Sequence, residues 1–234
     1  MHREPLSPDC VAILLAAGSA RRFGADKLQS RLGGRPLLAW ALGTLLASPA
    51  IGAVQLVGSE SNLGWLAELA SDGSDAKLLD PCPGGRVRSE STLAGLEAAG
   101  GEWTWALVHD GARPFISSAM IDAGLATARD VGAAIAAVPA QDTVQIVNEQ
   151  GLIDRTPPRS NAYLAQTPQI ARRQLLLEAH RRFASELERF TDEASVLRAV
   201  GQPVGVFAGD RNNLKITGPG DLALARAILA EFEN

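Results

Sequence analysis

The sequence predicts an α/β protein whose central sheet is mostly parallel. Apolar runs alternate with helical segments from residue 11 to residue 138, and this order is typical of parallel strands joined by crossover helices. Residues 11–15 form a continuous apolar run, as expected for a strand that is buried on both faces of such a sheet. We therefore expect a Rossmann-like, three-layer αβα fold around a twisted sheet.

The individual elements follow from apolar spacing and from the residues that interrupt it. Strands are predicted at residues 11–15, 53–57, 76–79, 103–108 and 133–138. Helices are predicted at residues 36–46, 63–70, 89–98 and 117–129. Pro36 suits the first position of the first helix, and Ser117 or Ser118 suits the N-cap of the last.

The alternation breaks between residues 142 and 167. Two strands, 143–147 and 152–155, flank a turn at 148–151, which predicts a protruding β-hairpin arm over about residues 142–162. A hairpin that leaves the main sheet needs a surface to pack on, and a second subunit is one candidate. Helices at 172–183, 192–200 and 219–232 and a strand at 204–207 then complete one domain spanning residues 1–234.

Composition excludes several classes of function. The chain has 22 Lys plus Arg against 26 Asp plus Glu, a net charge of −4, so we expect no nucleic-acid partner. Two distant cysteines exclude a disulfide framework, and three scattered histidines argue against a His-based metal site. No apolar run reaches the ~18 residues of a membrane helix. The first nine residues lack the apolar core of a signal peptide, so we expect a soluble, cytoplasmic protein without a membrane partner.

A local basic stretch follows the first strand. Between residues 21 and 35 a single acid, Asp26, accompanies five basic side chains: Arg21, Arg22, Lys27, Arg31 and Arg35. Such a cluster in an acidic chain indicates a small anionic ligand, although a solvated surface loop is the alternative interpretation. The spacing fits neither a P-loop nor a dinucleotide fingerprint. Backbone N–H groups at the small residues that end the strand, with positive charge beside them, would still suit a polyphosphate.

The order of the polar motifs resembles a known family. The segment Leu15-Ala16-Ala17-Gly18, followed by Arg21-Arg22 and Lys27, resembles the signature loop of sugar-phosphate and alditol-phosphate nucleotidyltransferases. Further motifs lie at residues 84–96, 108–114, 166–169, 191–194 and 213–221. Together they resemble the 2-C-methyl-D-erythritol 4-phosphate cytidylyltransferase family of the non-mevalonate isoprenoid pathway. The resemblance covers nearly the whole chain, and Gly111 stands where alanine is common in the family.

The resemblance implies a nucleotide site for CTP. Backbone groups would contact the cytidine nucleotide at Ala16, Ala17 and Gly18, and Gly85 and Ser91 would hold the cytosine. Asp110, with Gly111 beside it, would lie near the ribose and near a Mg²⁺ ion carried mainly by the triphosphate. The expected catalytic residues are the cations that would grip the phosphates: Arg22, Lys27 and Lys215.

The resemblance also implies an acceptor site and a dimer. The methylerythritol phosphate pocket would be lined by Asp110, Thr167, Thr191 and Lys215. Thr143 and Arg159 lie in the arm, and in the family the arm reaches the neighbouring subunit's site. We therefore expect a homodimer in which these two residues bind the substrate phosphate across the interface.

Each assignment has a structural alternative. Asp110 would also suit the cap of the following turn or helix. His109 would suit a general base, but the attacking phosphate is already ionised, which favours a packed residue at a strand end. Thr191, Asp192 and Glu193 would suit a helix N-terminus, with or without a role in binding.

Two alternative functions remain open at this stage. One is a transferase with another acceptor, such as ribitol 5-phosphate or a molybdopterin cofactor. The other is a non-catalytic nucleotide-binding module on the same fold.

Overall fold

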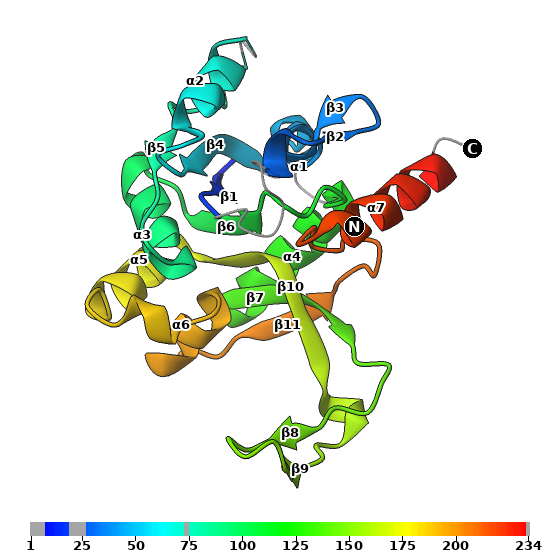
Figure 1. Ribbon diagram of the computed structural model, residues 1–234. Coiled ribbons are helices and arrows are strands. Elements are labelled where there is room, and N and C mark those ends of the chain that lie inside the picture. The colour runs from blue at the N-terminus through cyan, green and yellow to red at the C-terminus, as the bar shows by residue number, and fades with distance from the viewer. Residues whose placement is uncertain (1–7, 19–26, 73–74, 233–234) are drawn as a thin grey trace, which may run out of the picture.

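The computed structural model describes residues 8–18, 27–72 and 75–232, and a seven-stranded sheet runs through their centre (Figure 1). The strand order is β11-β7-β10-β6-β1-β4-β5, and every neighbouring pair is parallel except those made by β10. The strands are β1 Cys10–Ala16, β4 Ile51–Gly58, β5 Cys82–Pro83, β6 Trp105–Asp110, β7 Ala133–Pro139, β10 Tyr163–Arg172 and β11 Gly205–Ala208. The expected mostly parallel α/β fold is confirmed.

Helices cover both faces of the sheet, which gives three layers. One apolar cluster joins the sheet to α1 Leu37–Ala47, α2 Leu63–Asp72, α4 Ser118–Val131 and α7 Pro219–Phe232. The other cluster joins it to α3 Arg88–Ala98, α5 Arg173–Arg182 and α6 Glu193–Ala199. Strand β1 belongs to both clusters because its side chains alternate between the two faces, and all seven of its residues are buried.

The helix starts largely match the sequence. The hydroxyl of Ser117 caps α4 by accepting a hydrogen bond from the N–H of Met120 at 3.2 Å, as predicted. The first helix begins one residue later than predicted, because Pro36 has an extended conformation and pairs with Arg31 in the small β2–β3 hairpin. Strands β2 Arg31–Leu32 and β3 Arg35–Pro36 flank two glycines with positive φ.

Strand β10 is the main element that the sequence did not predict. Its ten residues lie antiparallel between β6 and β7, in a segment that carries the Gln166–Gln169 motif. The register with β7 shifts between Ala165 and Gln169, which leaves Pro168 out of the ladder. Proline has no N–H to donate, so this irregularity lets a central strand contain it.

The prediction of a strand at residues 76–79 is wrong. Leu78 forms only an isolated bridge with Val54, and the edge strand that pairs with β4 is β5, at Cys82 and Pro83. Pro81 lies between Leu78 and β5, and Pro83 lies within β5. Both prolines limit how far the chain can continue the ladder.

The arm is confirmed as a hairpin, although its strands are shorter than expected. Strands β8 Ile146–Val147 and β9 Ile153–Arg155 form a separate two-stranded sheet. In Figure 1 this hairpin projects away from the main sheet, beyond the start of β10. Short 3₁₀ helices lie at Lys27–Gln29, Arg159–Asn161 and Leu187–Arg189. Among the described residues, no helix has the length and apolar character needed to span a membrane.

Helix α3 is seated on the sheet through a glycine. A Cβ atom at Gly95 would lie 2.6 Å from Cγ2 of both Ile13 in β1 and Val57 in β4. Only a residue without a side chain permits this approach. The close packing brings the N-terminal turn of α3, with Arg88 and Ser91, beside the carboxyl end of β1.

We predict opposite effects of two glycine-to-alanine substitutions in helices. Gly95→Ala should lower the free energy of unfolding by about 1–3 kcal/mol, because the new methyl group overpacks the sheet contact. Gly64→Ala in α2 has open space around its Cβ and should raise the free energy of unfolding by up to about 1 kcal/mol. Urea unfolding measures both, and a stabilised Gly95→Ala variant would contradict the proposed packing.

Candidate active site

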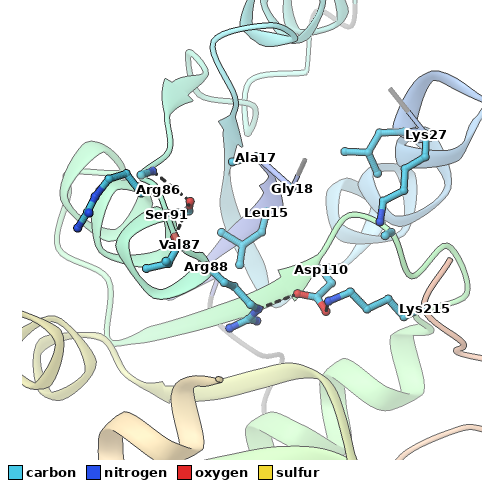
Figure 2. Close-up of a pocket in the computed structure, with 13 residues that line it drawn as sticks. Leu15, Ala17, Gly18, Lys27, Arg86, Val87, Arg88, Ser91, Asp110 and Lys215 are labelled. Atoms are coloured by element: carbon cyan, nitrogen blue, oxygen red, sulfur yellow. Dashed lines mark hydrogen bonds and ion pairs between the residues drawn. The ribbon is translucent and has the colours of Figure 1, made fainter. Parts of the chain in front are cut away.

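The candidate site lies at the carboxyl ends of two neighbouring parallel strands, β1 and β6. Ligands in open α/β sheets bind outside the carboxyl ends of the strands. A hollow of about 310 Å³ opens there, which we call the first hollow. Figure 2 shows Lys27 and Lys215 on the side opposite the segment from Arg86 to Ser91. The predicted residues that line the first hollow are Ala17, Gly18, Lys27, Gly85, Ser91, Asp110 and Lys215.

A second hollow of about 230 Å³ adjoins the first. Thr167 and Thr191, both predicted to bind the acceptor, line it. Three residues line both hollows, namely Arg88, Asp110 and Lys215. A ligand in one hollow would therefore meet a ligand in the other at these three charged side chains.

Asp110 is the electrostatic centre of this junction. Its Oδ1 lies 3.0 Å from Nε of Arg88, and its Oδ2 lies 2.8 Å from Nζ of Lys215. Arg113 adds a third cation, with Nε at 3.7 Å from Oδ2. The carboxylate makes these ion pairs, which the alternative interpretation of Asp110 as a helix or turn cap does not predict.

The surrounding cations keep Asp110 ionised. Burial alone would raise the pKa of this carboxyl group, but the charges of Arg88, Lys215 and Arg113 hold it well below its usual range. Two carboxylates likewise favour the charged form of Arg88. Burial would lower the pKa of its guanidinium, but Glu193 and Asp110 raise it above its usual value. Asp110 and Arg88 are therefore both charged at neutral pH.

A hydrogen-bond chain behind Asp110 sets the tautomer of His109. The Thr167 hydroxyl accepts the Asp110 N–H at 3.0 Å, so its own proton can go to Nδ1 of His109 at 2.9 Å. The proton of the neutral ring then lies on Nε2, which donates to the Arg113 carbonyl at 3.0 Å. His109 is fully buried, and it is a packed strand-end residue rather than a general base.

The loop before α3 is fixed by side chains of the helix. The Ser91 hydroxyl accepts the Gly85 N–H and donates to the Val87 carbonyl, both at 3.1 Å. Glu90 accepts the N–H of Arg86 at 2.7 Å. A Cβ atom at Gly84 would lie 2.7 Å from Cβ of Ala17 and from Oγ of Ser91. Ser91 thus shapes the wall of the first hollow.

The N-terminus of α6 is anchored to β10. Asp192 caps the helix by accepting the Ser195 N–H at 2.9 Å, so the helix N-terminus suggested at residues 191–193 is present. Gln169 contacts the same turn twice, through Asp192 Oδ2 at 3.0 Å and the Ala194 N–H at 3.1 Å. This anchoring positions Thr191, which immediately precedes the cap, at the second hollow.

Some expected site residues line neither hollow. Ala16 lies behind the first hollow, where its carbonyl accepts from Asn62 at 3.0 Å. Gly111 also lies behind it and donates to the Leu15 carbonyl at 2.8 Å. A Cβ at Gly111 would be 2.5 Å from Cδ1 of Leu38, which explains glycine at this position.

Two further expected residues lie elsewhere. Thr143 and Arg159 are exposed on the arm, away from both hollows of their own chain. Arg22 lies outside the described residues.

The described residues do not form a resident metal centre. None of them belongs to a group of three or more His, Cys, Asp or Glu side chains that could hold a metal ion. Within the described lining of the first hollow, Asp110 is the single carboxylate. Magnesium typically uses one or two carboxylates and completes its shell with water and substrate phosphates. Asp110 therefore fits a metal ion that arrives on a polyphosphate.

The fold and the joined hollows define an α/β protein of the class that binds nucleotides at the carboxyl ends of parallel strands. The family model described as 2-C-methyl-D-erythritol 4-phosphate cytidylyltransferase matches residues 10–231. The chain therefore belongs to the 2-C-methyl-D-erythritol 4-phosphate cytidylyltransferase family.

Individual relatives agree with the family model. A 2-C-methyl-D-erythritol 4-phosphate cytidylyltransferase of Dehalococcoides mccartyi is 39% identical over 93% of this chain and 95% of the relative. One from Desulforamulus reducens is 37% identical over 94% and 95%. The crystal structure of 4-diphosphocytidyl-2C-methyl-D-erythritol synthase from Anaerococcus prevotii has a TM-score of 0.85 at 28% identity, covering 94% of this chain and 98% of that one.

We predict that His109 is neutral at pH 6 with its proton on Nε2. Burial lowers the pKa of His109 to about 4, so the unfolded state binds more protons as the pH falls from about 6.5 to 4. The free energy of unfolding should therefore fall through this window. Ring ¹⁵N NMR identifies the tautomer, and an imidazolium at pH 6 would contradict the hydrogen-bond chain.

A matched variant separates the contribution of His109. Burial lowers the pKa of His180 as well, so both histidines act in the same direction on stability. His109→Gln should remove the corresponding ring signals and flatten part of the pH dependence of unfolding. The signals of His180 serve as the internal control.

Proposed function

We propose that the protein transfers CMP from CTP to 2-C-methyl-D-erythritol 4-phosphate, giving 4-diphosphocytidyl-2-C-methyl-D-erythritol and pyrophosphate. Family membership over residues 10–231 supports this reaction, which belongs to the synthesis of isoprenoid precursors. The observation that carries the proposal is the junction of two hollows at Asp110. A nucleotide and an acceptor phosphate need such adjacent places to react. Residues 1–234 would act as one catalytic domain in the cytoplasm.

The first hollow would take CTP. Gly85 and Ser91 would contact the cytosine, in a loop that Ser91 itself holds in shape. The backbone at Ala17 and Gly18 would approach the phosphates, because small residues there leave the N–H groups accessible. Lys27 would neutralise the triphosphate together with Arg22, and positive charge fixed around a phosphoryl group stabilises its displacement.

The second hollow would take methylerythritol phosphate. Thr167 and Thr191 would contact the polyol, since hydroxyl groups can both donate to and accept from other hydroxyls. Lys215 lines both hollows and would lie beside the α-phosphate and the attacking phosphate. Its partial exposure, 38% of the side chain, leaves it room to move from Asp110 toward an incoming phosphate.

The chemistry would be an in-line displacement at the α-phosphorus. A phosphate oxygen of the acceptor attacks, a new P–O bond forms, and the bond to the bridging oxygen breaks. Pyrophosphate leaves with that electron pair. The attacking phosphate is already ionised at neutral pH, so His109 has no proton to remove. The cations Arg22, Lys27 and Lys215 would stabilise the charge that develops.

The cofactor would be Mg²⁺. It would arrive with the triphosphate, and Asp110 would be its protein ligand beside the ribose. When bound, a divalent cation neutralises phosphate charge and withdraws electrons from the reacting phosphorus. Removal of divalent ions with EDTA should then abolish turnover, and added Mg²⁺ should restore it.

The arm would form a homodimer. Its exposed apolar side chains support an interface, with Val147 57%, Leu152 65% and Ile153 64% exposed. Thr143 and Arg159, which are far from the hollows of their own chain, would bind the acceptor phosphate in the partner's site.

Pyrophosphate release tests the function directly. The four common nucleoside triphosphates are each combined with methylerythritol phosphate, ribitol 5-phosphate or no acceptor. We expect release with CTP and methylerythritol phosphate at least about 100-fold above every other pair, because binding at both hollows must orient the reactants. Preference for ribitol phosphate would contradict the acceptor assignment. CTP binding without release under any condition would favour a non-catalytic module.

We predict subunit complementation between Lys27→Ala and Arg159→Ala. Each homodimer should lose most activity, because every site lacks one phosphate contact. In a mixed dimer, one site carries both changes and the other carries neither, so random mixing should restore about a quarter of the parent activity. The assay is pyrophosphate release after the two chains are co-expressed.

Lys27→Ala with Lys215→Met provides the matched control for complementation. Both of these residues line the first hollow of the same chain, so every mixed dimer keeps a defect in each site and activity should stay low. If Lys27→Ala and Arg159→Ala failed to complement while the mixed dimer formed, the cross-subunit role of Arg159 would be wrong.

A further inference from the structure

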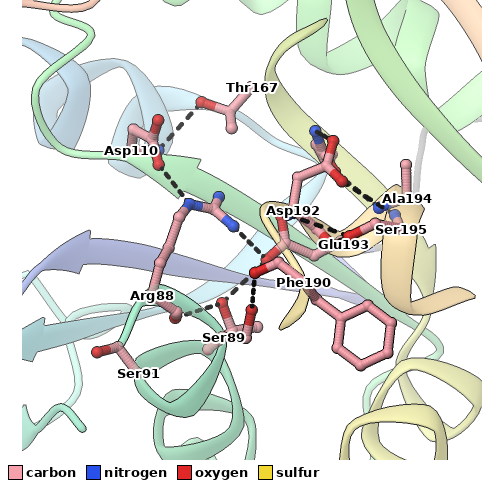
Figure 3. Close-up of polar contacts among 12 residues, drawn as sticks. Arg88, Ser89, Ser91, Asp110, Thr167, Phe190, Asp192, Glu193, Ala194 and Ser195 are labelled. Atoms are coloured by element: carbon pink, nitrogen blue, oxygen red, sulfur yellow. Dashed lines mark hydrogen bonds and ion pairs between the residues drawn. The ribbon is translucent and has the colours of Figure 1, made fainter. Parts of the chain in front are cut away.

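Glu193 is a buried carboxylate that lines neither hollow, and only 2% of it is exposed. Its Oε1 accepts hydrogen bonds from Nη1 of Arg88 at 2.8 Å and from the Thr92 hydroxyl at 2.9 Å. Its Oε2 is also buried and has no hydrogen-bond partner among the described residues. Figure 3 shows Arg88 between Asp110 and Glu193.

Stability does not explain such a group. Taking a carboxylate out of water is expensive, and ion pairing in the interior often only offsets that cost. An oxygen left without a partner adds a further penalty. Apolar side chains in place of both Arg88 and Glu193 would fill the space between α3 and α6 at a similar or lower cost, which points to a role for the carboxylate beyond stability.

The geometry of Arg88 identifies that role. Its Nη1 is held by Glu193, and its Nε donates to Asp110 Oδ1 at 3.0 Å. A guanidinium is planar and rigid, so a bond at one edge fixes the direction of the others. The position of Glu193 thus determines how Arg88 meets Asp110, at the junction of the two hollows.

Glu193 also belongs to the segment that forms the second hollow. It follows Asp192, which caps α6 and is contacted by Gln169, and Thr191 lies just before the cap. The same turn therefore carries Thr191 to the acceptor side and Glu193 to Arg88. A shift of this turn would therefore move side chains that line both hollows at the same time.

We propose that Glu193 is a positioning residue for the transfer reaction, which it influences by orienting Arg88 against Asp110. This proposal rests on the proposed function. Glu193 fixes the position of the first hollow relative to the second, and it touches neither reactant. Loss of its charge should impair the alignment of the reactants more than the binding of CTP.

Steady-state kinetics of Glu193→Gln test the proposal. The amide keeps the shape but loses the charge, and misplaced reactants lower turnover strongly. We expect kcat to fall at least about tenfold, while the KM for CTP stays within about threefold. Glu188→Gln is the matched control, because Glu188 is exposed on the nearby 3₁₀ helix and lines neither hollow. An unchanged kcat in Glu193→Gln would overturn the proposal.

A double-mutant cycle with Arg88→Met separates positioning from general destabilisation. If Glu193 acts through Arg88, then Glu193→Gln should cause no further loss of kcat in the Arg88→Met background. Glu193→Gln should also raise the melting temperature of the Arg88→Met variant, because it removes a buried charge that has lost its cationic partner. Equal losses of kcat in both backgrounds would contradict the proposal.

An NMR readout does not depend on the substrate. Hydrogen exchange of the Arg88 Nε–H, assigned with the Arg88→Met variant, should be slow in the parent and at least about tenfold faster in Glu193→Gln. Unchanged exchange would overturn the role of Glu193. If the parent released no pyrophosphate from any substrate pair, the proposed function would fail, and this exchange rate would still decide whether Glu193 orients Arg88.

Discussion

The ion pairs around Asp110 are the interaction on which the candidate site depends. A buried carboxylate is stable here because Arg88, Lys215 and Arg113 surround it from three different segments. Those segments are the start of α3, the turn that follows β6 and the chain before α7. Asp110 therefore joins parts of the molecule that are far apart in sequence, and it does so where the two hollows meet. The same carboxylate keeps Arg88 in place from one side, while Glu193 holds it from the other.

Close packing makes this convergence possible. Glycines at 84, 95 and 111 lie where any side chain would strike a neighbour within 3 Å. They let α3 and the loops that follow β5 and β6 approach β1. Charged side chains from these segments can then reach the two hollows. The pocket is thus a consequence of backbone proximity, and local hydrogen bonds such as those of Ser91 hold its walls in shape.

Local patterns allowed much of the sheet to be predicted from the sequence, whereas the candidate site residues came from the resemblance of its motifs to a known family. The apolar run of β1 and the cap at Ser117 depend on neighbouring residues, and both are confirmed. Strand β10 was missed because the polar motif containing Pro168 obscures its alternation. The partnership of Arg88 and Glu193 was missed because the two residues lie 105 positions apart, and only the fold brings them together. The arm's contribution to a partner site stays a prediction.

We propose that Asp110 and its cations divide one reaction site into a nucleotide half and an acceptor half. A crystal structure with a non-reactive CTP analogue and methylerythritol phosphate bound together is the most direct measurement. We expect the triphosphate beside Lys27 and the polyol beside Thr167 and Thr191, with the ion pair between Arg88 and Asp110 intact between them. Both ligands in the same hollow, or an Arg88 side chain turned away from Asp110, would contradict it.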